Sequence, residues 1–394
     1  MRFLLKNFTA TRYKEVLFTG SLDFSGSGFC MLGAPRSGKT PLALALCGGE
    51  RATGEFYLDD TAMHGLSARE RNCGVLFGAR TLFRGTVRDN IAKGLILRGE
   101  PLSVARQRAE EAAELFGLEG ILELPAKKCD FLTAQKIVFL RLIVRKPRLI
   151  VMDYPVRGDS EEELQFLAEA KKIAEEKGIF LLLLTQNARH AALFSHVAVI
   201  EGGKLTAFAA RENLLAAPPT LAAARLLSSS GNELYAVREG DFLSVGGQKI
   251  ISVCSLSPQA YLPNSGEPCL LFCYEAAFIL GEDAAPLTPF TENAIRVRVD
   301  YCERIVSEES AALYRYYLDF DLSGEEQQGK ITRFTLLSSR APLQTDDYLT
   351  VKPVEKRLTS FALPQKTNSC KKKKKISLTR KTIQPSPKGK RRTP

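Results

Sequence analysis

The sequence contains no tryptophan, only three histidines, and nine cysteines that are scattered along the chain. Protein zinc sites usually take their ligands from histidines and from paired cysteines in CxxC units, and this sequence has no such pair. We therefore expect no zinc site. The scattered cysteines are typical of reduced thiols in the core of a cytosolic protein, because disulfide-stabilised secreted chains are short and cysteine-dense.

Long apolar runs are also missing. The stretch IFLLLL at residues 179–184 is far too short to span a bilayer, which needs about 20 apolar residues. The N-terminal segment MRFLLKNFTATRYKEVLF lacks an apolar core followed by a small-residue cleavage site, so we expect no signal peptide. The hydrophobic fraction of 45% is ordinary for a folded soluble protein.

Acidic residues are absent from residues 371–394, which contain eleven lysines or arginines. Removing these from the 55 basic residues leaves 44, equal to the 44 acidic residues, so this tail accounts for the whole net charge of +11. We expect residues 364–394 to be disordered. The tail is either a solvated extension or a contact for anionic lipid, which attracts each basic residue by about 1 kcal/mol. Non-specific contact with nucleic acid is a third option, but no interleaved aromatics predict sequence-specific recognition.

The rest of the chain divides into two parts by its pattern. Residues 1–212 alternate strand and helix signals, which indicates an α/β fold. Residues 213–232 are punctuated by proline and serine and are predicted to be a linker. Residues 233–363 carry short strand signals without helical patterns between them, which favours a small β barrel or sandwich.

Several elements can be placed from local signals. Apolar runs predict strands, a residue such as Asp159 or Ser160 is expected to cap a helix that ends at Gly178, and Gly202-Gly203 is expected to turn a hairpin. The expected strands lie at 28–33 and 179–184, and a hairpin is expected at 197–207. The expected helices lie at 42–47, within 86–118 with a break near Gly99 and Pro101, and from 160 to 178.

The segment GAPRSGKT at residues 33–40 fits the phosphate-loop pattern GxxxxGK[ST] and lies between a predicted strand and a predicted helix. Its glycines allow successive backbone N–H groups to point at phosphate oxygens, and the helix N-terminus adds positive potential. Lys39 is expected to reach the terminal phosphates, while the Thr40 hydroxyl is expected to bind Mg²⁺. The predicted nucleotide-binding residues of the loop are Gly33, Ala34, Pro35, Arg36, Ser37, Gly38, Lys39 and Thr40.

A second candidate site residue, Asp153, ends the apolar run LIVMD at 149–153. A carboxylate at the C-terminal end of a buried strand can hold a metal ion at the edge of the sheet. We therefore predict Thr40 and Asp153 as Mg²⁺ ligands. The residue after Asp153 is Tyr154, although nucleotide hydrolases often have a second carboxylate there.

With these motifs in order, residues 1–212 resemble the nucleotide-binding subunit of an ABC transporter, which implies a P-loop NTPase core with a helical subdomain. Tyr13 falls where the family has an adenine-stacking aromatic. LFRGTVRDNIAKGL resembles the stretch after the Gln loop, and VRKPRLIVMD resembles the approach to the Walker B aspartate. VAVIEGGKL resembles the hairpin after the switch region. The resemblance implies ATP and Mg²⁺ as cofactors.

Several positions depart from the family pattern. Gly78 stands where the family has the Gln-loop glutamine, Tyr154 replaces the catalytic glutamate, and Gln186 replaces the switch histidine. The signature LSGGQ is unrecognisable, and falls either on CDFLT (129–133) or on FLTAQ (131–135). Within the loop, Arg36 replaces a glycine, and Pro41 removes a backbone donor.

These changes are expected to affect hydrolysis more than binding. A positioned general base is worth about 10² to 10⁴ in rate. Tyrosine has an ordinary pKa of about 10 and is a poor proton acceptor near neutral pH, and the glutamine amide cannot shuttle a proton. Because the loop and Asp153 remain, we expect a subunit that binds ATP with little or no hydrolysis, and no intact catalytic residue. In the family's dimer each site joins one chain's loop to its partner's signature, so a homodimer should be nearly inert.

The second half resembles the OB-like TOBE domains of sugar, polyamine and anion importers. PTLAAARLLSSSGN (219–232) resembles the junction before that domain, and ENAIRVRVDYCERI, ALYRYYLDFDL and TDDYLTVKPVEKRL follow its strand order. The resemblance implies transmembrane permease partners and a second ATPase subunit, identical or different. It also implies a place at the cytosolic face of the cell membrane.

Two other interpretations stay open. The chain could be an interaction or regulatory protein built on a pseudo-ATPase ABC fold, with ATP as a structural ligand at most. It could also be a working ATPase with relocated catalytic groups, for which Glu161 or Asp159 would be the nearest substitutes. Both acids fit better as helix-capping residues.

Overall fold

The structure is a computed structural model that describes residues 1–78, 81–228, 231–245, 248–256, 260–274, 278–280, 295–305, 313–320, 333–338, 348–353 and 358–361. The basic segment 371–394 therefore lies outside the described residues. Within the described part, none of the helices combines the length and the apolar character needed to cross a bilayer.

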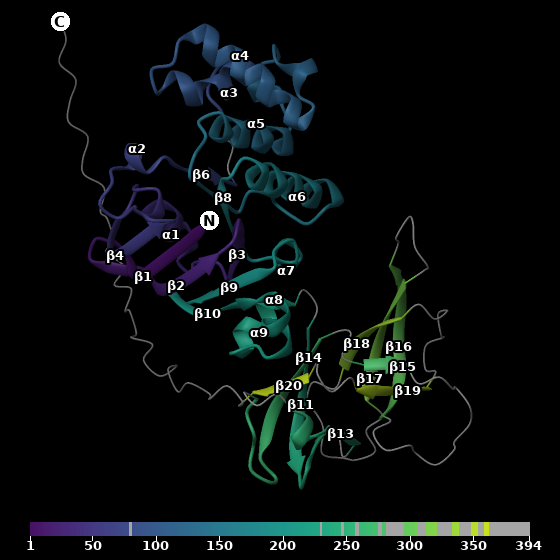
Figure 1. Ribbon diagram of the computed structural model, residues 1–394. Helices are drawn as coiled ribbons and strands as arrows, with labels where there is room; N and C mark the ends of the chain where they lie inside the picture. Colours follow the sequence, from purple (N-terminus) through teal and green to yellow (C-terminus); the bar gives the residue numbers. More distant parts are fainter. Residues whose placement is uncertain are drawn as a thin grey trace, which may run out of the picture. The chain divides into compact units, whose positions relative to one another are not determined.

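A ten-stranded sheet organises the first half of the chain (Figure 1). Its strand order is β5-β4-β1-β2-β10-β9-β3-β8-β7-β6, and the run from β9 to β6 is parallel. The strands are β1 (Arg2–Arg12), β2 (Glu15–Ser25), β3 (Gly28–Gly33), β4 (Arg51–Leu58), β5 (Thr61–Ala62), β6 (Cys73–Phe77), β7 (Leu149–Asp153), β8 (Phe180–Thr185), β9 (His196–Glu201) and β10 (Lys204–Ala210).

The parallel strands are buried on both faces, which explains their continuous apolar sequences. Successive residues of a strand point to opposite faces of the sheet. In β8, Leu181 and Leu183 belong to one hydrophobic core, whereas Phe180 and Leu182 belong to the other. The sheet is therefore covered by packed layers on its two sides, as the α/β prediction requires.

Helices connect and cover these strands. They are α1 (Lys39–Leu46), α2 (Ala68–Arg71), α3 (Val87–Ile96), α4 (Leu102–Ala113), α5 (Phe131–Ile143), α6 (Glu161–Glu176), α7 (Ala188–Ala191), α8 (Arg211–Ala216) and α9 (Leu221–Leu227). Helices α3, α4 and α5 pack side by side around a core of their own, with Ile91, Ala109 and Ile137 fully buried (Figure 1). These helices form the helical subdomain that the sequence resemblance predicted beside a P-loop NTPase core.

Local signals at the helix ends are confirmed. Ser160 is the N-cap of α6, where its hydroxyl accepts the amide proton of Glu163. Gly178 follows that helix with a φ of 64°. The predicted break near Gly99 and Pro101 separates α3 from α4, since a proline in a helix interior would remove a backbone hydrogen bond.

The segment 213–232, which we predicted to be a linker, contains regular structure in its described residues. Much of it is helical, in α8 and α9, and Leu214, Ala223 and Leu227 are buried in a core that they share with the main sheet. Thr220 caps α9 by accepting the amide proton of Ala223. Proline and serine therefore lie at helix boundaries in this segment. The apolar residues between them form helices because they pack into the core beside the main sheet.

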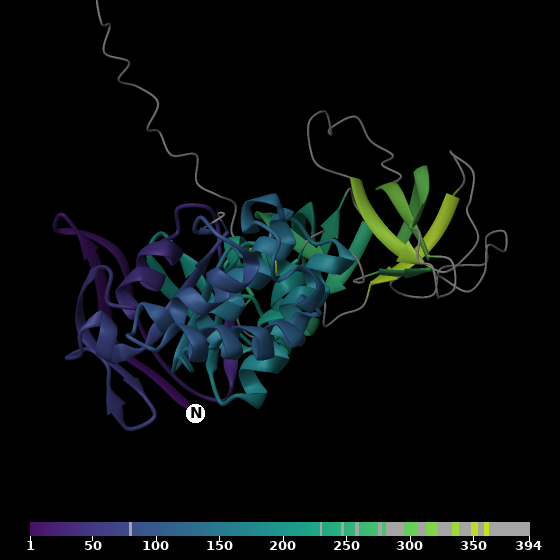
Figure 2. The same cartoon turned by 90° about the horizontal axis from the view of Figure 1, so that it is seen from above.

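The described residues of the second half form two antiparallel five-stranded sheets, which fit the predicted C-terminal β region (drawn green to yellow in Figures 1 and 2). Their orders are β13-β12-β11-β14-β20 and β15-β19-β16-β17-β18. The strands are β11 (Gly231–Glu239), β12 (Phe242–Val245), β13 (Gln248–Ser252), β14 (Pro268–Tyr274), β15 (Phe278–Leu280), β16 (Ile295–Ile305), β17 (Leu313–Phe320), β18 (Arg333–Ser338), β19 (Tyr348–Pro353) and β20 (Leu358–Phe361).

One buried polar residue in α5 yields a stability prediction. Gln135 has 0% exposure, and neither atom of its amide has a hydrogen-bond partner among the described residues. A buried amide without partners costs roughly 1–3 kcal/mol. Gln135→Leu should therefore raise the free energy of unfolding, measured by urea denaturation, by about 1–3 kcal/mol. The exposed Gln107→Leu is the control, and equal changes in the two variants would contradict the explanation.

Candidate functional site

The candidate site lies where four adjacent parallel strands end. The phosphate loop follows β3, Gln186 follows β8, Tyr154 follows β7 and Gly78 follows β6. Ligands of open α/β sheets bind in the crevice beyond the carboxyl ends of the strands. The fold therefore brings together the retained loop and three positions that depart from the family pattern.

Lys39 is turned into its own loop. Its ammonium donates hydrogen bonds to the carbonyl oxygens of Gly33 (2.6 Å) and Ala34 (2.9 Å) and to the Ser37 Oγ (2.9 Å). The side chain is 2% exposed, and burial lowers the pKa of Lys39 to about 8, against the nearby charge of Asp153. An ammonium has three protons to donate, so a phosphate must displace at least one of these partners.

The shape of the loop depends on Gly38. This residue has a φ of 99°, and a Cβ there would lie 2.2 Å from the carbonyl oxygen of Leu17 on β2. The carbonyl of Ser37 accepts the amide proton of Gly203 (3.1 Å), so the predicted hairpin turn is hydrogen-bonded to the phosphate loop. Arg36 has a φ of 63°, so the residue that replaces the family's glycine is in a strained left-handed conformation.

Asp153 and Thr40 form the candidate Mg²⁺ site. The Thr40 hydroxyl donates to Asp153 Oδ2 at 2.6 Å. The second carboxylate oxygen, Oδ1, is buried and has no hydrogen-bond partner in the described part of the chain. Burial raises the pKa of Asp153, against the Thr40 hydrogen bond and the charge of Lys39. A buried oxygen without a partner beside a hydroxyl fits a hard cation such as Mg²⁺.

Tyr154 follows β7 and lies beside Lys39. Its ring centroid lies 5.1 Å from Lys39 Nζ, in a cation–π contact. Burial, followed by the charge of Asp153, raises the pKa of Tyr154 to about 12. The phenol therefore stays protonated at neutral pH.

Gly78 is pressed against the backbone of Tyr154. Its amide donates to the carbonyl of Asp153 at 2.9 Å, and a Cβ at this position would lie 1.9 Å from the carbonyl oxygen of Tyr154. No side chain fits there unless the backbone moves. Positions 78 and 154 are therefore in contact, although they are far apart in the sequence.

Other predicted positions are less constrained. Gln186 is exposed just beyond β8, and Tyr13 is 97% exposed in the turn between β1 and β2. Pro41 lies in the first turn of α1, where backbone N–H groups have no intrahelical partner, so the helix tolerates it. Both signature registers fall at the start of α5, where Asp130 caps the helix by accepting from the amide and hydroxyl of Thr133 (2.9 and 2.6 Å).

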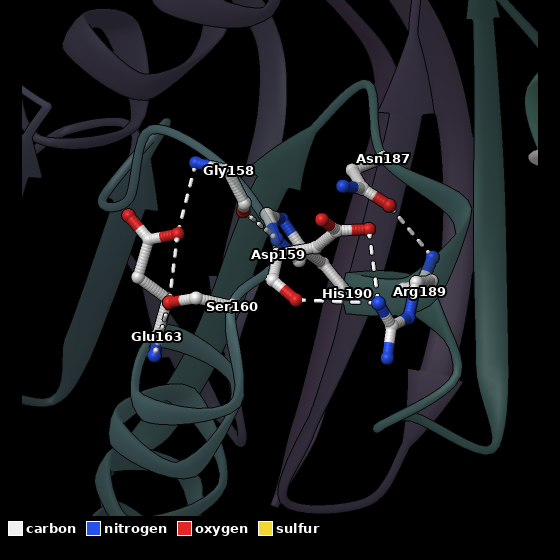
Figure 3. Close-up of polar contacts among 7 residues, drawn as sticks. All are labelled: Gly158, Asp159, Ser160, Glu163, Asn187, Arg189 and His190. Atoms are coloured by element: carbon white, nitrogen blue, oxygen red, sulfur yellow. Dashed lines mark hydrogen bonds and ion pairs between the residues drawn. The ribbon is translucent and has the colours of Figure 1, made fainter. Parts of the chain in front are cut away.

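The loop after Tyr154 is held from two sides (Figure 3). On α6, the Glu163 carboxylate accepts the amide protons of Arg157 (2.9 Å) and Gly158 (3.0 Å). On α7, Arg189 pairs with the Asp159 carboxylate at 3.3 Å. Because Asp159 forms this ion pair at the surface, it is disfavoured as a substitute catalytic base.

His190 is the site-neighbouring residue that sequence reasoning missed. It is 4% exposed, and its Nε2 donates to the carbonyl of Gly158 at 2.7 Å, while the Thr185 hydroxyl lies 2.9 Å from Nδ1 (Figure 3 shows the Gly158 contact). Burial lowers the pKa of His190. Its rarity, as one of three histidines, was the available signal.

Comparisons with known proteins agree with this geometry. A family described as "ABC transporter" matches residues 24–157. The thiamine import ATP-binding protein ThiQ of Vibrio vulnificus (strain YJ016) is 31% identical over 201 residues, which cover 50% of this chain and 86% of ThiQ.

Two other matches cover a larger share of the chain. The osmoprotective compounds uptake ATP-binding protein GgtA of Synechocystis is 27% identical over 253 residues, 62% of this chain and 69% of that protein. The sn-glycerol-3-phosphate import ATP-binding protein UgpC of Ruegeria pomeroyi is 26% identical over 257 residues, 62% of this chain and 73% of that protein. Together with the phosphate loop and its carboxylate, these matches identify the chain as a member of the ABC transporter family.

Proposed function

We propose that this chain is the ATP-binding subunit of an ABC importer and that it hydrolyses ATP weakly or not at all. The observation that supports this best is the contrast within one site. Lys39, Thr40 and Asp153 are in place around the phosphate loop, whereas the adjacent position after the strand holds the neutral phenol of Tyr154.

ATP and Mg²⁺ are the proposed ligands. The loop amides and Lys39 would hold the phosphates, Tyr13 would stack on the adenine, and Thr40 and Asp153 would hold Mg²⁺. The ion, when bound, supplies positive charge that neutralises the phosphate oxygens. Asp153 Oδ1, which is buried without a protein partner among the described residues, supports this assignment.

The proposed loss of hydrolysis rests on four positions. Tyr154 cannot act as a base, and Gln186 cannot shuttle a proton. Gly78 offers no side chain to a metal ion or a membrane partner. The signature segment lacks the glycines that would let its backbone approach a partner's nucleotide. The chain would therefore be a pseudo-ATPase with a structural or gating role in its complex.

The relatives suggest the setting. Their names describe import of thiamine and of glycerol 3-phosphate and uptake of osmoprotective compounds. We propose a sugar, polyamine or similar small solute as cargo, permease subunits and a second ATPase subunit as partners, and a peripheral position at the cytosolic face of the membrane. The basic segment 371–394 would contact anionic lipid there.

We also propose that the chain contains two domains. Residues 1–212 would form the ABC-type nucleotide-binding domain, and residues 233–363 would form a TOBE-like, OB-related domain. The two antiparallel sheets in the second half support a separate β module. Helices α8 and α9, which lie between these two ranges, pack in the same hydrophobic core as residues 1–212. The folded first part therefore extends beyond residue 212.

The direct test measures binding and turnover on the same purified full-length chain. Equilibrium titration with Mg-ATP should show saturable binding, while steady-state phosphate release should not exceed that of Asp153→Ala. Sustained release that Asp153→Ala abolishes would overturn the weak-hydrolysis proposal and favour a working ATPase. Failure to bind at millimolar nucleotide would leave the interaction protein as the better reading.

The pKa of Lys39 predicts how binding depends on pH. With a pKa of about 8 in the free protein, the ammonium is intact below pH 8 and loses its proton above it. A phosphate site needs the charged form, so the Kd for Mg-ATP should rise by about tenfold per pH unit well above pH 8. Titration calorimetry between pH 7 and pH 9.5 would measure this.

The matched control for the pH profile is Lys39→Arg, whose guanidinium stays charged throughout this range. Its profile should be flat even if its affinity is lower. If Kd rises equally with pH in both proteins, the pH dependence comes from the titration of a group other than Lys39.

A further inference from the structure

Tyr154 lies beside Lys39, the residue that is expected to reach the terminal phosphates. In a phosphate loop the backbone amides hold the α- and β-phosphates, and the lysine reaches between the β- and γ-phosphates. Here the three protons of Lys39 point to acceptors within the loop, and the Tyr154 ring lies 5.1 Å from the same ammonium. The ring therefore lies next to the ammonium that a γ-phosphate would contact.

The position of Tyr154 is fixed by its backbone. It has a φ of 50° immediately before Pro155, although the residue before a proline favours the extended region. A strained residue persists only where its surroundings determine its conformation. The Tyr154 amide donates to the carbonyl of Leu184 at 3.0 Å, and its carbonyl oxygen packs onto Gly78, where a Cβ would come within 1.9 Å.

The face of the ring is also electrostatically unfavourable next to a third phosphate. A γ-phosphate brings further negative charge, and the ring face carries negative electrostatic potential and no hydrogen-bond donor. A diphosphate can draw one proton of Lys39 toward its β-phosphate while the ring stays in place. A triphosphate must displace the ring and break its contact with the ammonium.

We propose that Tyr154 is a specificity-determining residue and that this site prefers a magnesium-bound nucleoside diphosphate to the triphosphate. The proposal rests on the nucleotide-binding function proposed above and adds the ligand class that the site favours. The chain would then hold the product form of the nucleotide, as a structural ligand, without producing it.

The experiment titrates the full chain with Mg-ADP and with Mg-ATP by calorimetry. The wild type should bind Mg-ADP about tenfold more tightly, a difference of about 1.4 kcal/mol. In Tyr154→Ala the ratio should fall to one or reverse. Tyr57→Ala, on β4, is the matched tyrosine control and should keep the wild-type ratio. Tighter or equal binding of Mg-ATP by the wild type, or an unchanged ratio in Tyr154→Ala, would overturn the inference alone.

If neither nucleotide binds, the inference fails together with the proposed function, so the two failures are distinguishable. A second variant uses the absence of tryptophan from the chain. Tyr154→Trp would carry a single indole next to Lys39. Mg-ADP should leave its emission nearly unchanged, and Mg-ATP should shift it by moving the ring. Equal shifts with both nucleotides would refute the displacement of the ring.

Discussion

Replacing Lys39 by methionine should weaken Mg-nucleotide binding by about 100-fold while the fold is retained. The ammonium would make charge-assisted hydrogen bonds to phosphate oxygens, each worth about 1.5–3 kcal/mol, and two such bonds correspond to about two decades in Kd. Methionine keeps the apolar stem of this buried side chain but removes all three donors. Titration calorimetry with Mg-ADP and Mg-ATP would measure the loss.

The control for this variant is Lys172→Met, on the exposed side of α6, where the lysine side chain is 78% exposed. Its nucleotide affinity should equal that of the wild type. Thermal unfolding of Lys39→Met must show one cooperative transition for the comparison to hold. Nucleotide binding that survives Lys39→Met in a folded protein would show that the phosphate loop is not the binding site.

Restoring the family's glutamine at position 78 should destabilise this protein. The sequence resemblance places the Gln-loop glutamine at this position, but here a Cβ would lie 1.9 Å from the carbonyl oxygen of Tyr154. The Gly78 amide is anchored on the carbonyl of Asp153, so the clash cannot be relieved without breaking a strand-end hydrogen bond. We expect Gly78→Gln to lower the free energy of unfolding by about 3 kcal/mol, the upper part of the range for overpacking.

Urea unfolding of Gly78→Gln beside Gly65→Gln makes this test specific. A Cβ at Gly65 meets nothing within 4 Å, so its replacement should change the stability by less than about 0.5 kcal/mol. Similar losses in the two variants would mean that the close approach of residues 78 and 154 does not constrain the backbone. A specific loss at 78 would show that returning one family residue is incompatible with the tyrosine's conformation.

Much of the site could be predicted from local sequence. The phosphate loop is a contiguous motif whose glycines, lysine and threonine sit at fixed offsets, and it lies between β3 and α1 as expected. Asp153 ends a run of buried residues, so its place at a strand end followed from the pattern. The cap at Ser160 and the turn at Gly202-Gly203 are also set by neighbouring residues.

Other features depended on distant contacts. The segment 213–232 has the composition of a linker, yet α8 and α9 form there because the main sheet offers them an apolar surface. The ring of Tyr154 over Lys39 joins residues that are far apart in the chain. The same holds for His190 and Gly158, whose hydrogen bond ties α7 to the loop after β7.

By itself, the sequence determined the α/β class, the phosphate loop and the carboxylate at the end of β7, because each depends on a short stretch of residues. The replacement of the family's catalytic side chains stays a prediction from the sequence. Only the tertiary structure decided that the four strand ends form one site, that Gly78 and Tyr154 exclude a side chain between them, and that Lys39 is enclosed. Parallel strands pair residues that are remote in sequence, so these relations arise from the packing of the sheet and not from any local pattern.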